Sequence, residues 1–240
     1  MISSSPPNAS APEKRHALRH PTAGETTLYL VRHGRTESNQ RNVMVGITDV
    51  PLDAVGVGQA RAIAERLASE VDADVLLASP LSRAFETARI IGARIGLTPV
   101  ARPDVVEIDF GDLEGVSIDR FLEDHSSLWL RMLDDADQEV GWPDGESRHG
   151  FQQRVRAAFQ SILEEYAHHR VIVVTHGGVI GAFLASVLGL SPNAPEAWDI
   201  ANCSLSHLDV DASGTWVRAH NDTVHLEVLA EPDDDVAVIA

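Results

Sequence analysis

Cysteine and lysine are almost absent from this chain of 240 residues. Its single cysteine, Cys203, excludes an internal disulfide and favours a reducing compartment, so we expect a cytoplasmic protein. The single lysine, Lys14, excludes a P-loop, because the GxxxxGK[ST] motif needs a lysine that no later position supplies. No run of 18 apolar residues occurs, so no membrane-spanning segment is predicted.

Positive charge is also scarce. There are 36 acidic residues against 19 lysines and arginines, which gives a net charge of −17. This balance argues against a partner that is nucleic acid or an anionic membrane. Every basic side chain from Arg15 onward is arginine, the residue suited to two-pronged binding of carboxylate or phosphate. A genome rich in G and C would explain the total equally well, so the positions of the arginines matter more than their number.

The chain is expected to hold one domain between two tails. Residues 1–25 are rich in serine, proline and alanine, and no apolar segment follows their basic residues. They are therefore predicted to be a disordered leader rather than a secretory signal. Residues 26–230 are predicted to form a single domain, and residues 231–240, which contain EPDDD, an acidic tail.

Apolar residues recur with strand and helix periods in alternation. The predicted strands are 27–32, 74–79, a short segment near Val100, 170–175, 204–211 and 215–220. The predicted helices are 56–71, 81–96, 118–124, 128–133, 147–168 and 179–190. This alternation predicts the α/β class, with a mostly parallel central sheet covered by helices on both faces in a three-layer α/β/α sandwich.

Cationic or potentially cationic side chains follow three of these strands. Arg32 and His33 follow the first in VRHG, Arg83 follows the second in ASPLSRA, and His176 follows the third in VTHGG. Ligands of such sheets bind beyond the carboxyl ends of the strands, so we expect these four side chains to gather at one edge. A cationic cluster in so acidic a chain needs a counter-anion. With the amide of Asn39 it would form a cage for a phosphate dianion.

His33 could act as a nucleophile toward that phosphate. Imidazole attacks only when it is neutral, and the positive charges of Arg32 and Arg83 disfavour its protonation. The carbonyl of Gly34 could hold one ring nitrogen and leave the other aimed at phosphorus. Attack would form a phosphohistidine, while the arginines and His176 stabilise the charge on the transferred group.

A proton donor for the leaving alcohol is expected in the segment EIDFGDLEG. The segment offers Glu107, Asp109, Asp112 and Glu114, and the residues by themselves do not choose among them.

Taken together and in this order, RHGRTESN, ASPLSRAFETA, EIDFGDLEG and VTHGG resemble the histidine phosphatase superfamily, including its phosphoglycerate mutase-like phosphatases. The resemblance runs from about Thr27 to Leu226 and implies the phosphoglycerate mutase-like fold. It assigns His33 as nucleophile, Glu107 as proton donor, and Arg32, Asn39, Thr48, Arg83 and His176 as phosphate or substrate ligands. One departure is LDAVG where the family often reads LTxxG, which bears on the cap of the following helix.

These observations predict a metal-independent phosphatase that needs no cofactor and acts on a small phosphorylated metabolite. His33 would attack the phosphoryl group while Glu107 protonates the leaving alkoxide, and Glu107 would then activate water to hydrolyse the phosphohistidine. The sequence does not indicate which phosphomonoester is the substrate, nor the oligomeric state.

Two alternatives remain. A cofactor-dependent phosphoglycerate mutase would use the same site, but only 68 residues, 108–175, lie between Glu107 and His176. The mutase branch resembles chains with a longer, arginine-bearing insertion there. A non-catalytic binding protein of the same fold is disfavoured because no residue of the expected site is missing.

Several neighbouring residues have a structural interpretation. Arg35 and Arg41 are predicted to be solvated loop residues. Asp109 would serve as proton donor only if Glu107 pointed away from the site. Five apolar residues of the region between the second and third site strands either line a substrate pocket or cover the core: Leu128, Trp129, Leu130, Met132 and Trp142.

Overall fold

A computed structural model describes residues 24–134, 136–137, 139–191 and 199–229. Residues 1–23 of the expected leader and the whole of the expected acidic tail lie outside the described residues. Among the described residues, no helix has both the length and the apolar character that crossing a membrane requires.

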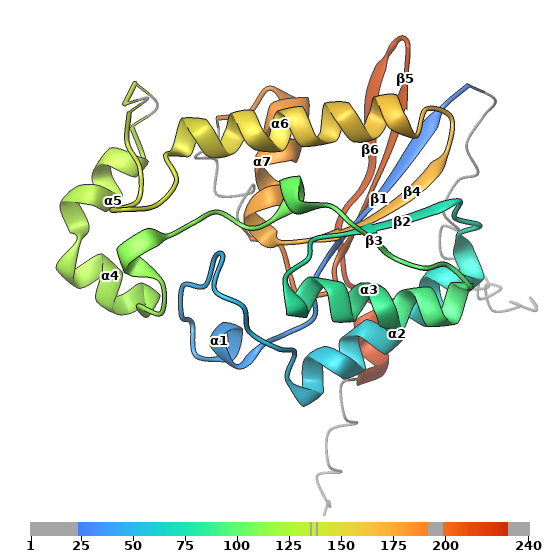
Figure 1. The fold of residues 1–240 in the computed structure, drawn as a ribbon, viewed down its shortest axis with the longest axis horizontal. Coiled ribbons are helices and arrows are strands. Elements are labelled where there is room, and N and C mark those ends of the chain that lie inside the picture. The colour runs from blue at the N-terminus through green and yellow to red at the C-terminus, as the bar shows by residue number, and fades with distance from the viewer. Residues whose placement is uncertain (1–23, 135, 138, 192–198, 230–240) are drawn as a thin grey trace, which may run out of the picture.

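A six-stranded sheet forms the middle of the molecule, in the order β3-β2-β4-β1-β5-β6. The strands are β1 (Thr26–Arg32), β2 (Val75–Ala78), β3 (Val100–Ala101), β4 (Arg170–Thr175), β5 (Leu205–Asp211) and β6 (Gly214–Asp222). The first four are parallel, β5 runs antiparallel to β1, and β6 runs antiparallel to β5. The mostly parallel sheet is therefore confirmed, with an antiparallel hairpin at one side (Figure 1).

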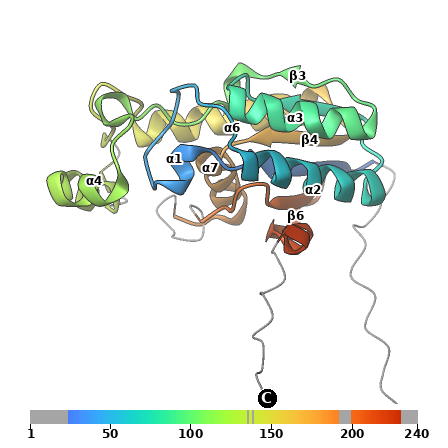
Figure 2. The same cartoon turned by 90° about the horizontal axis from the view of Figure 1, so that it is seen from below.

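Helices cover both faces of this sheet. The α-helices are α1 (Glu37–Gln40), α2 (Ala54–Glu70), α3 (Ser82–Ile95), α4 (Ile118–Asp124), α5 (Ser126–Met132), α6 (Arg148–Glu165) and α7 (Gly177–Leu188). Short 3-10 turns occur at η1 (Pro103–Val105), η2 (Gly111–Leu113) and η4 (Val224–Leu229). In Figure 2, α2 and α3 lie in front of the strands and α6 and α7 lie behind them, which confirms the three-layer α/β/α sandwich.

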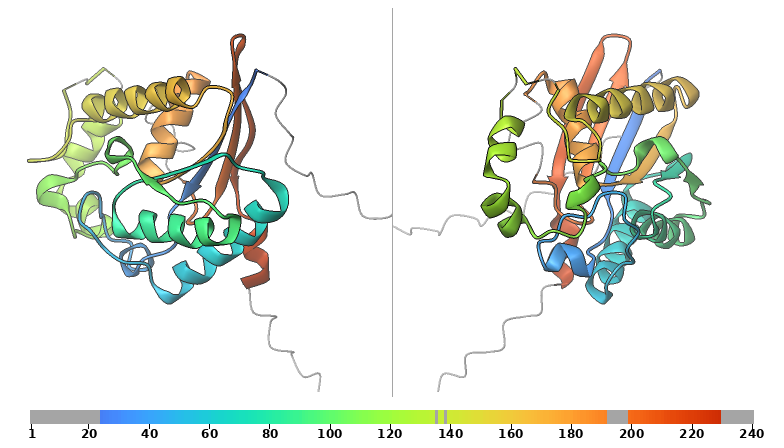
Figure 3. Two further views of the ribbon diagram at one scale, coloured as in Figure 1. Left: turned by 45° about the vertical axis from the view of Figure 1, so that its right-hand side comes forward. Right: turned by 60° about the vertical axis from the view of Figure 1, so that its left-hand side comes forward.

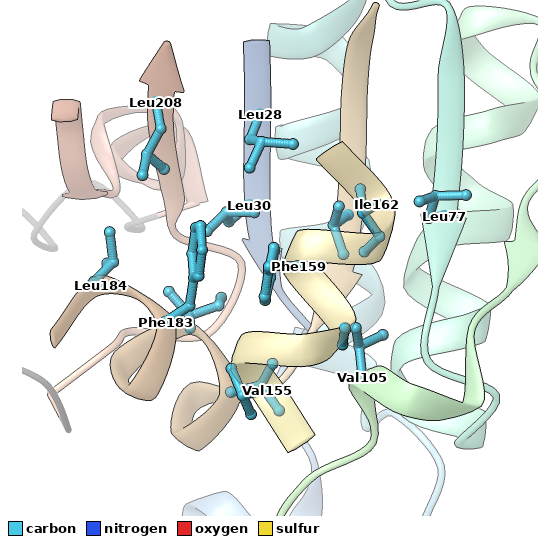
Figure 4. Packing of buried hydrophobic residues seen from close by; sticks show 14 of the residues in the cluster. Leu28, Leu30, Leu77, Val105, Val155, Phe159, Ile162, Phe183, Leu184 and Leu208 are labelled. Carbon is cyan, nitrogen blue, oxygen red and sulfur yellow. The ribbon is translucent and has the colours of Figure 1, made fainter. Parts of the chain in front are cut away.

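The alternating side chains of β1 explain why it reads as a continuous apolar run. Leu28 and Leu30 point to the face covered by α6 and α7, whereas Tyr29 and Val31 point to the face covered by α2 and α3. A central strand is buried on both faces, so successive positions in its middle, residues 28–31, are all apolar. Figure 4 shows the first of these cores, where Phe159 of α6 stacks on a second aromatic ring from α7.

The pair α4 and α5 does not belong to either helical layer. It stands at one end of the molecule, beyond the sheet, as the views of Figures 1 and 3 agree. It is anchored to the loop after β1, because Ile118 donates its N–H to the carbonyl of Asn42 across 2.9 Å. Its own small core contains Met44, Leu113 and Phe121.

The helix after β4 begins earlier than the sequence predicts, and this matters for the site. The periodicity places the last helix at 179–190, whereas α7 starts at Gly177, directly after β4. His176 is the residue that precedes the helix, so the first turn of α7 faces the carboxyl end of the sheet. Apolar periodicity misses this turn because its first two residues are glycines.

Candidate active site

The four expected cationic groups lie at one edge of the sheet, where three parallel strands end. Arg32 ends β1 and His33 follows it, Arg83 lies in the first turn of α3 after β2, and His176 follows β4. His33 and His176 are buried, and their ring centroids lie 5.2 Å apart at an interplanar angle of 61°. The structure thus brings together groups that are far apart in the chain.

The imidazole of His33 is held at both nitrogens. Its Nδ1 lies 2.8 Å from the carbonyl oxygen of Gly34, and its Nε2 accepts the Nε–H of Arg83 across 3.3 Å. Only the neutral tautomer with its proton on Nδ1 satisfies both contacts, since Nδ1 must donate and Nε2 must accept. Burial, followed by the charges of Arg32 and Arg83, lowers the pKa of His33 well below its usual value. Nε2 therefore keeps a lone pair for attack.

Gly34 is required at its position by close packing. A Cβ atom there would lie 2.5 Å from the carbonyl oxygen of Gly56 in α2. The Gly34 N–H donates to the hydroxyl of Thr87 in α3 across 3.0 Å. Because both neighbouring helices fix the main chain at this residue, the carbonyl that orients His33 has little freedom to move.

Arg83 is oriented by main-chain carbonyls as well as by His33. Its Nη1 donates to the carbonyl of Thr48 across 3.0 Å, and its Nη2 donates to the carbonyl of Gly46 across 2.6 Å. The carboxylate of Glu114 in turn accepts the N–H groups of Gly46, Ile47 and Thr48. Thr48 therefore contributes its main chain, and the residue itself is exposed.

Two buried polar atoms beside His33 have no partner within the described part of the protein. They are Nε of Arg32 and Nδ1 of His176. The rest of each side chain is bonded: Nη1 of Arg32 donates to the carbonyl of Ile200, and Nε2 of His176 lies 2.8 Å from Oγ of Ser79. Buried polar groups are normally paired, and each unpaired one costs about 1–3 kcal/mol. An anion between these two atoms would satisfy both.

Glu107 lies beside the same cluster, where the first turn of α7 holds its carboxylate. Its carboxylate accepts the N–H of Ile108 and that of Gly178, each across 3.0 Å. Burial raises the pKa of Glu107, although the two main-chain hydrogen bonds and the charges of Arg83 and Arg32 oppose this. A carboxyl group whose protonated form is favoured at higher pH is suited to donating a proton.

The other acids of this segment are committed elsewhere or exposed. Asp109 accepts the N–H of Gly111 within its own loop, and Asp112 is exposed. Glu114 binds the main-chain amides of the 46–48 loop and of Phe110. The geometry therefore favours Glu107 among the four candidates that the sequence offers.

The amide oxygen of Asn39 is committed to hydrogen bonds with neighbouring residues. Asn39 lies in the short helix α1, where its Oδ1 accepts the N–H and the hydroxyl of Thr36. The same oxygen accepts Nδ2–H of Asn202, whose amide also donates to the carbonyl of His33. Only the amide nitrogen of Asn39 is left to contact a phosphate oxygen.

Two residues of this site escaped the sequence analysis. Ser79 holds His176, and its position within ASPLSRA directly after a strand could have indicated it. Asn202 joins Asn39 to the carbonyl of His33, and no motif marks it because it lies far along the chain from both.

The arginines predicted to be loop residues are paired with acids. Arg35 donates its Nε–H to Asp53 across 2.7 Å, and Arg41 lies 2.5 Å from Glu37 on an exposed helix. Neither is directed into the cationic cluster by any described contact.

The apolar residues of the α4–α5 region divide into two groups. Met132 is buried, and Trp142 packs edge-on against Phe110 with ring centroids 4.8 Å apart. Trp142 and Leu128 pack against the small core of that region. Trp129 and Leu130 are exposed at its surface.

No group of three or more histidine, cysteine, aspartate or glutamate side chains within the described ranges is arranged to hold a metal ion. The positive charge at the described site comes from Arg32 and Arg83, with two histidines that burial keeps neutral.

Comparisons with known proteins identify the family of this chain. A family model of the histidine phosphatase superfamily (branch 1) matches residues 28–223. The chain is 34% identical over 208 residues to the "Probable phosphoglycerate mutase GpmB" of Yersinia pestis (strain Pestoides F), covering 85% of this chain and 96% of the relative. The alpha-ribazole phosphatase of Shigella flexneri is a similar solved structure, with 28% identity, a TM-score of 0.70, and coverage of 82% of this chain and 96% of that chain. A mycobacterial glucosyl-3-phosphoglycerate phosphatase shows 27% identity, a TM-score of 0.73, and coverage of 81% and 98%. The chain belongs to the histidine phosphatase superfamily and has its phosphoglycerate mutase-like fold.

Proposed function

We propose that this protein is a phosphatase that hydrolyses a small phosphomonoester through a phosphohistidine on His33, without a metal ion or other cofactor. The observation that carries the proposal is the neutral His33 imidazole, whose Nε2 faces Arg83 across 3.3 Å beside the unpartnered Nε of Arg32. A phosphoryl group placed there would meet a nucleophile and two guanidinium groups at once.

The first half of the reaction forms the covalent intermediate. Nε2 of His33 attacks phosphorus, the bond from phosphorus to the ester oxygen breaks, and the leaving oxygen takes the proton of Glu107. Arg32, Arg83 and the unpartnered Nδ1 of His176 are placed to stabilise the charge on the non-bridging oxygens. The amide of Asn39 and the loop at Thr48 would border the bound phosphate.

The second half regenerates the enzyme. Glu107, now ionised, removes a proton from water, and the water oxygen attacks phosphorus. The bond between phosphorus and Nε2 breaks, inorganic phosphate leaves, and His33 and Glu107 return to their starting protonation states. A general acid and base of this kind contributes roughly 10²- to 10⁴-fold.

A phosphoglycerate mutase is the second candidate, because the curated relative at 34% identity carries that name. A mutase must also bind the carboxylate of phosphoglycerate, which calls for a further cation. In the described part of the α4–α5 region, Arg120 is paired with Asp124 and Arg131 with Asp137. Because these two arginines are already paired with acidic neighbours, they are poorly suited to bind the carboxylate of phosphoglycerate. Their pairing therefore supports the phosphatase over the mutase.

The test is a panel of phosphomonoesters, including 3-phosphoglycerate, assayed for inorganic phosphate and for phosphoglycerate isomers. We expect free phosphate from the wild type and none above background from His33→Ala. Isomer formation in place of phosphate release would establish the mutase instead. If His33→Ala released phosphate as fast as the wild type, the activity would not come from this site. The site would then have a binding role rather than a catalytic one.

A cytoplasmic location is part of this proposal. It rests on the single cysteine, Cys203, which is buried and whose pKa is raised by that burial. Such a thiol is inert and needs no oxidising compartment.

A further inference from the structure

Arg154 of α6 holds the main chain that carries Glu107. Its Nη1 donates to the carbonyls of Asp104 and Val106 across 3.1 and 2.9 Å. Its Nη2 donates to the carbonyl of Glu107 itself across 3.3 Å. Figure 1 shows α6 passing beside the η1 turn where this segment starts. The guanidinium of Arg154 therefore hydrogen-bonds to three main-chain carbonyls of the segment 104–107, which ends at the proposed proton donor.

The remaining carbonyl of this segment is also held. Thr175, the last residue of β4, donates its hydroxyl to the carbonyl of Val105 across 2.7 Å. Four successive carbonyls, from residue 104 to residue 107, are thus bonded by side chains from α6 and β4. Because this stretch is neither strand nor α-helix, these side chains replace the hydrogen bonds that regular structure would supply.

The far end of Glu107 is fixed independently. Its carboxylate is bonded to the N–H of Gly178 in α7, next to His176. Arg154 and Gly178 thus hold the main chain and the side chain of the same residue from two different helices. A displacement at either end would move the proton away from the leaving oxygen.

Glu146 in turn orients Arg154. Its two carboxylate oxygens accept Nε–H and Nη2–H of Arg154 across 2.9 and 2.8 Å, a two-pronged pairing. The N–H of Glu146 donates to the carbonyl of Asp109, so the same pair also ties the 141–147 loop to the segment after Glu107. The Arg154 side chain lies over the ring of Phe151, 5.1 Å from its centroid.

We propose that Arg154 is the positioning residue of Glu107 and that Glu146 fixes the orientation of its guanidinium; this inference rests on the phosphatase function proposed above. Arg154 does not touch the phosphoryl group. It sets the distance between the Glu107 proton and the leaving oxygen, so its loss affects proton transfer more than phosphate binding.

Leaving groups of different basicity separate this role from a purely structural one. An alkyl phosphate needs a proton on its leaving oxygen, whereas p-nitrophenolate leaves without one. For Arg154→Gln we expect kcat/KM for glycerol phosphate to fall by roughly 10- to 100-fold. We expect kcat/KM for p-nitrophenyl phosphate to fall by less than about threefold, because that step needs no general acid.

Hydrolysis of the phosphoenzyme provides a second readout. Glu107 must act as a base in that step whichever substrate formed the intermediate. Arg154→Gln should therefore show a burst of p-nitrophenol equal to the enzyme concentration, followed by slow turnover. A variant that is only less stable would show no burst, since formation and hydrolysis of the intermediate would decline together.

Arg102→Gln is the matched control. Arg102 also joins α6 to the same segment, but it bonds the side chains of Asp104, Ser161 and Glu165 and no carbonyl near Glu107. We expect its substitution to lower stability and to leave the ratio of the two kcat/KM values unchanged. If Arg154→Gln does not fold, Arg154→Lys and Glu146→Gln are tested instead. We expect them to show the same selective loss of kcat/KM for glycerol phosphate, but a smaller one.

The benchmark is Glu107→Gln, which should lose glycerol phosphate activity selectively by about 10²- to 10⁴-fold. An equal loss on both substrates by the Arg154 variants, beside a selective loss by Glu107→Gln, overturns the positioning role and leaves the phosphatase intact. Selective loss by Arg102→Gln overturns it too. A wild type that releases no phosphate from either substrate instead overturns the proposed function, and this inference with it.

Discussion

Arg83 donates its Nε–H to Nε2 of His33 across 3.3 Å, so the proposed phosphate ligand is in direct contact with the proposed nucleophile. The charge of the guanidinium lowers the pKa of His33, and its Nε–H points at the ring atom of the proposed nucleophile. A phosphate oxygen that binds Arg83 is thereby brought toward Nε2. In the proposed mechanism, the nucleophile and the charge that stabilises the transferred group are therefore organised together.

The protonation of His33 can be measured in the free enzyme. We expect His33 to stay neutral, with its proton on Nδ1, as the pH is lowered through about 6.5, where an ordinary histidine takes a second proton. ¹⁵N NMR of labelled imidazole reports both the charge and the tautomer, and a His33→Asn variant identifies the signal. In Arg83→Gln the titration should move to higher pH, because one of the charges that oppose protonation is gone. Protonation of wild-type His33 near pH 6.5 would contradict the site geometry.

Glu107 should determine the alkaline limb of activity. The first step needs its carboxyl group protonated, and burial raises its pKa, so kcat/KM for an alkyl phosphate should fall as the pH rises through that raised pKa. Glu107→Gln has no proton to lose, so its much lower rate should show no such limb. The profiles are measured at constant ionic strength. An alkaline limb that survives in Glu107→Gln would assign the proton donor to another residue.

Gly178→Ala should displace the proposed proton donor. The new Cβ would lie 2.4 Å from Oε1 of Glu107, so the carboxylate has to leave its place. We expect a loss of roughly 10²-fold in kcat/KM for alkyl phosphates. Gly58→Ala is the control, since a Cβ at that position in α2 meets nothing within 4 Å.

The control variant should itself gain stability. Alanine is favoured over glycine inside a helix by about 0.5–1 kcal/mol, so Gly58→Ala should unfold at higher urea concentration with unchanged activity. Full activity of Gly178→Ala on alkyl phosphates would show that the observed contact between Glu107 and α7 has no part in the reaction.

Asp53 is the N-cap residue of α2. Its Oδ1 accepts the N–H of Gly56 at the start of α2 across 2.7 Å, and its Oδ2 accepts Nε–H of Arg35. We expect Asp53→Ala to lower the free energy of unfolding by about 0.5–2 kcal/mol, the usual cost of losing an N-cap. Asp53→Thr should keep most of that stability. Equal losses in the two variants, measured by urea unfolding, would assign the effect to the pairing with Arg35 instead.

Chelation tests the absence of a catalytic metal. Arginine side chains supply at this site the positive charge that Mg²⁺ supplies in many phosphatases, so phosphate release should persist in EDTA. The measurement compares initial rates before and after dialysis against EDTA, with and without added Mg²⁺. Complete loss on dialysis, restored by Mg²⁺, would show that a metal ion takes part.

The sequence predicted most of the framework because its signals are local. Apolar runs at 27–32 and 170–175 indicated buried strands, and the general rule for parallel sheets placed Arg32, Arg83 and His176 at one edge. The short helix α1 was missed, because four residues carry no apolar periodicity. The start of α7 was missed because its first two residues are glycines.

What the sequence determined alone is the set of chemical groups at the carboxyl ends of three strands, since strand period and motif order are properties of neighbouring residues. The tertiary structure decided how those groups are held: Glu114 under the loop that orients Arg83, Asn202 behind His33, and Arg154 on the carbonyls before Glu107. Each of these contacts joins segments that only folding brings together. Their partners are main-chain atoms, which every residue type offers alike, so no pattern of side chains could have revealed them.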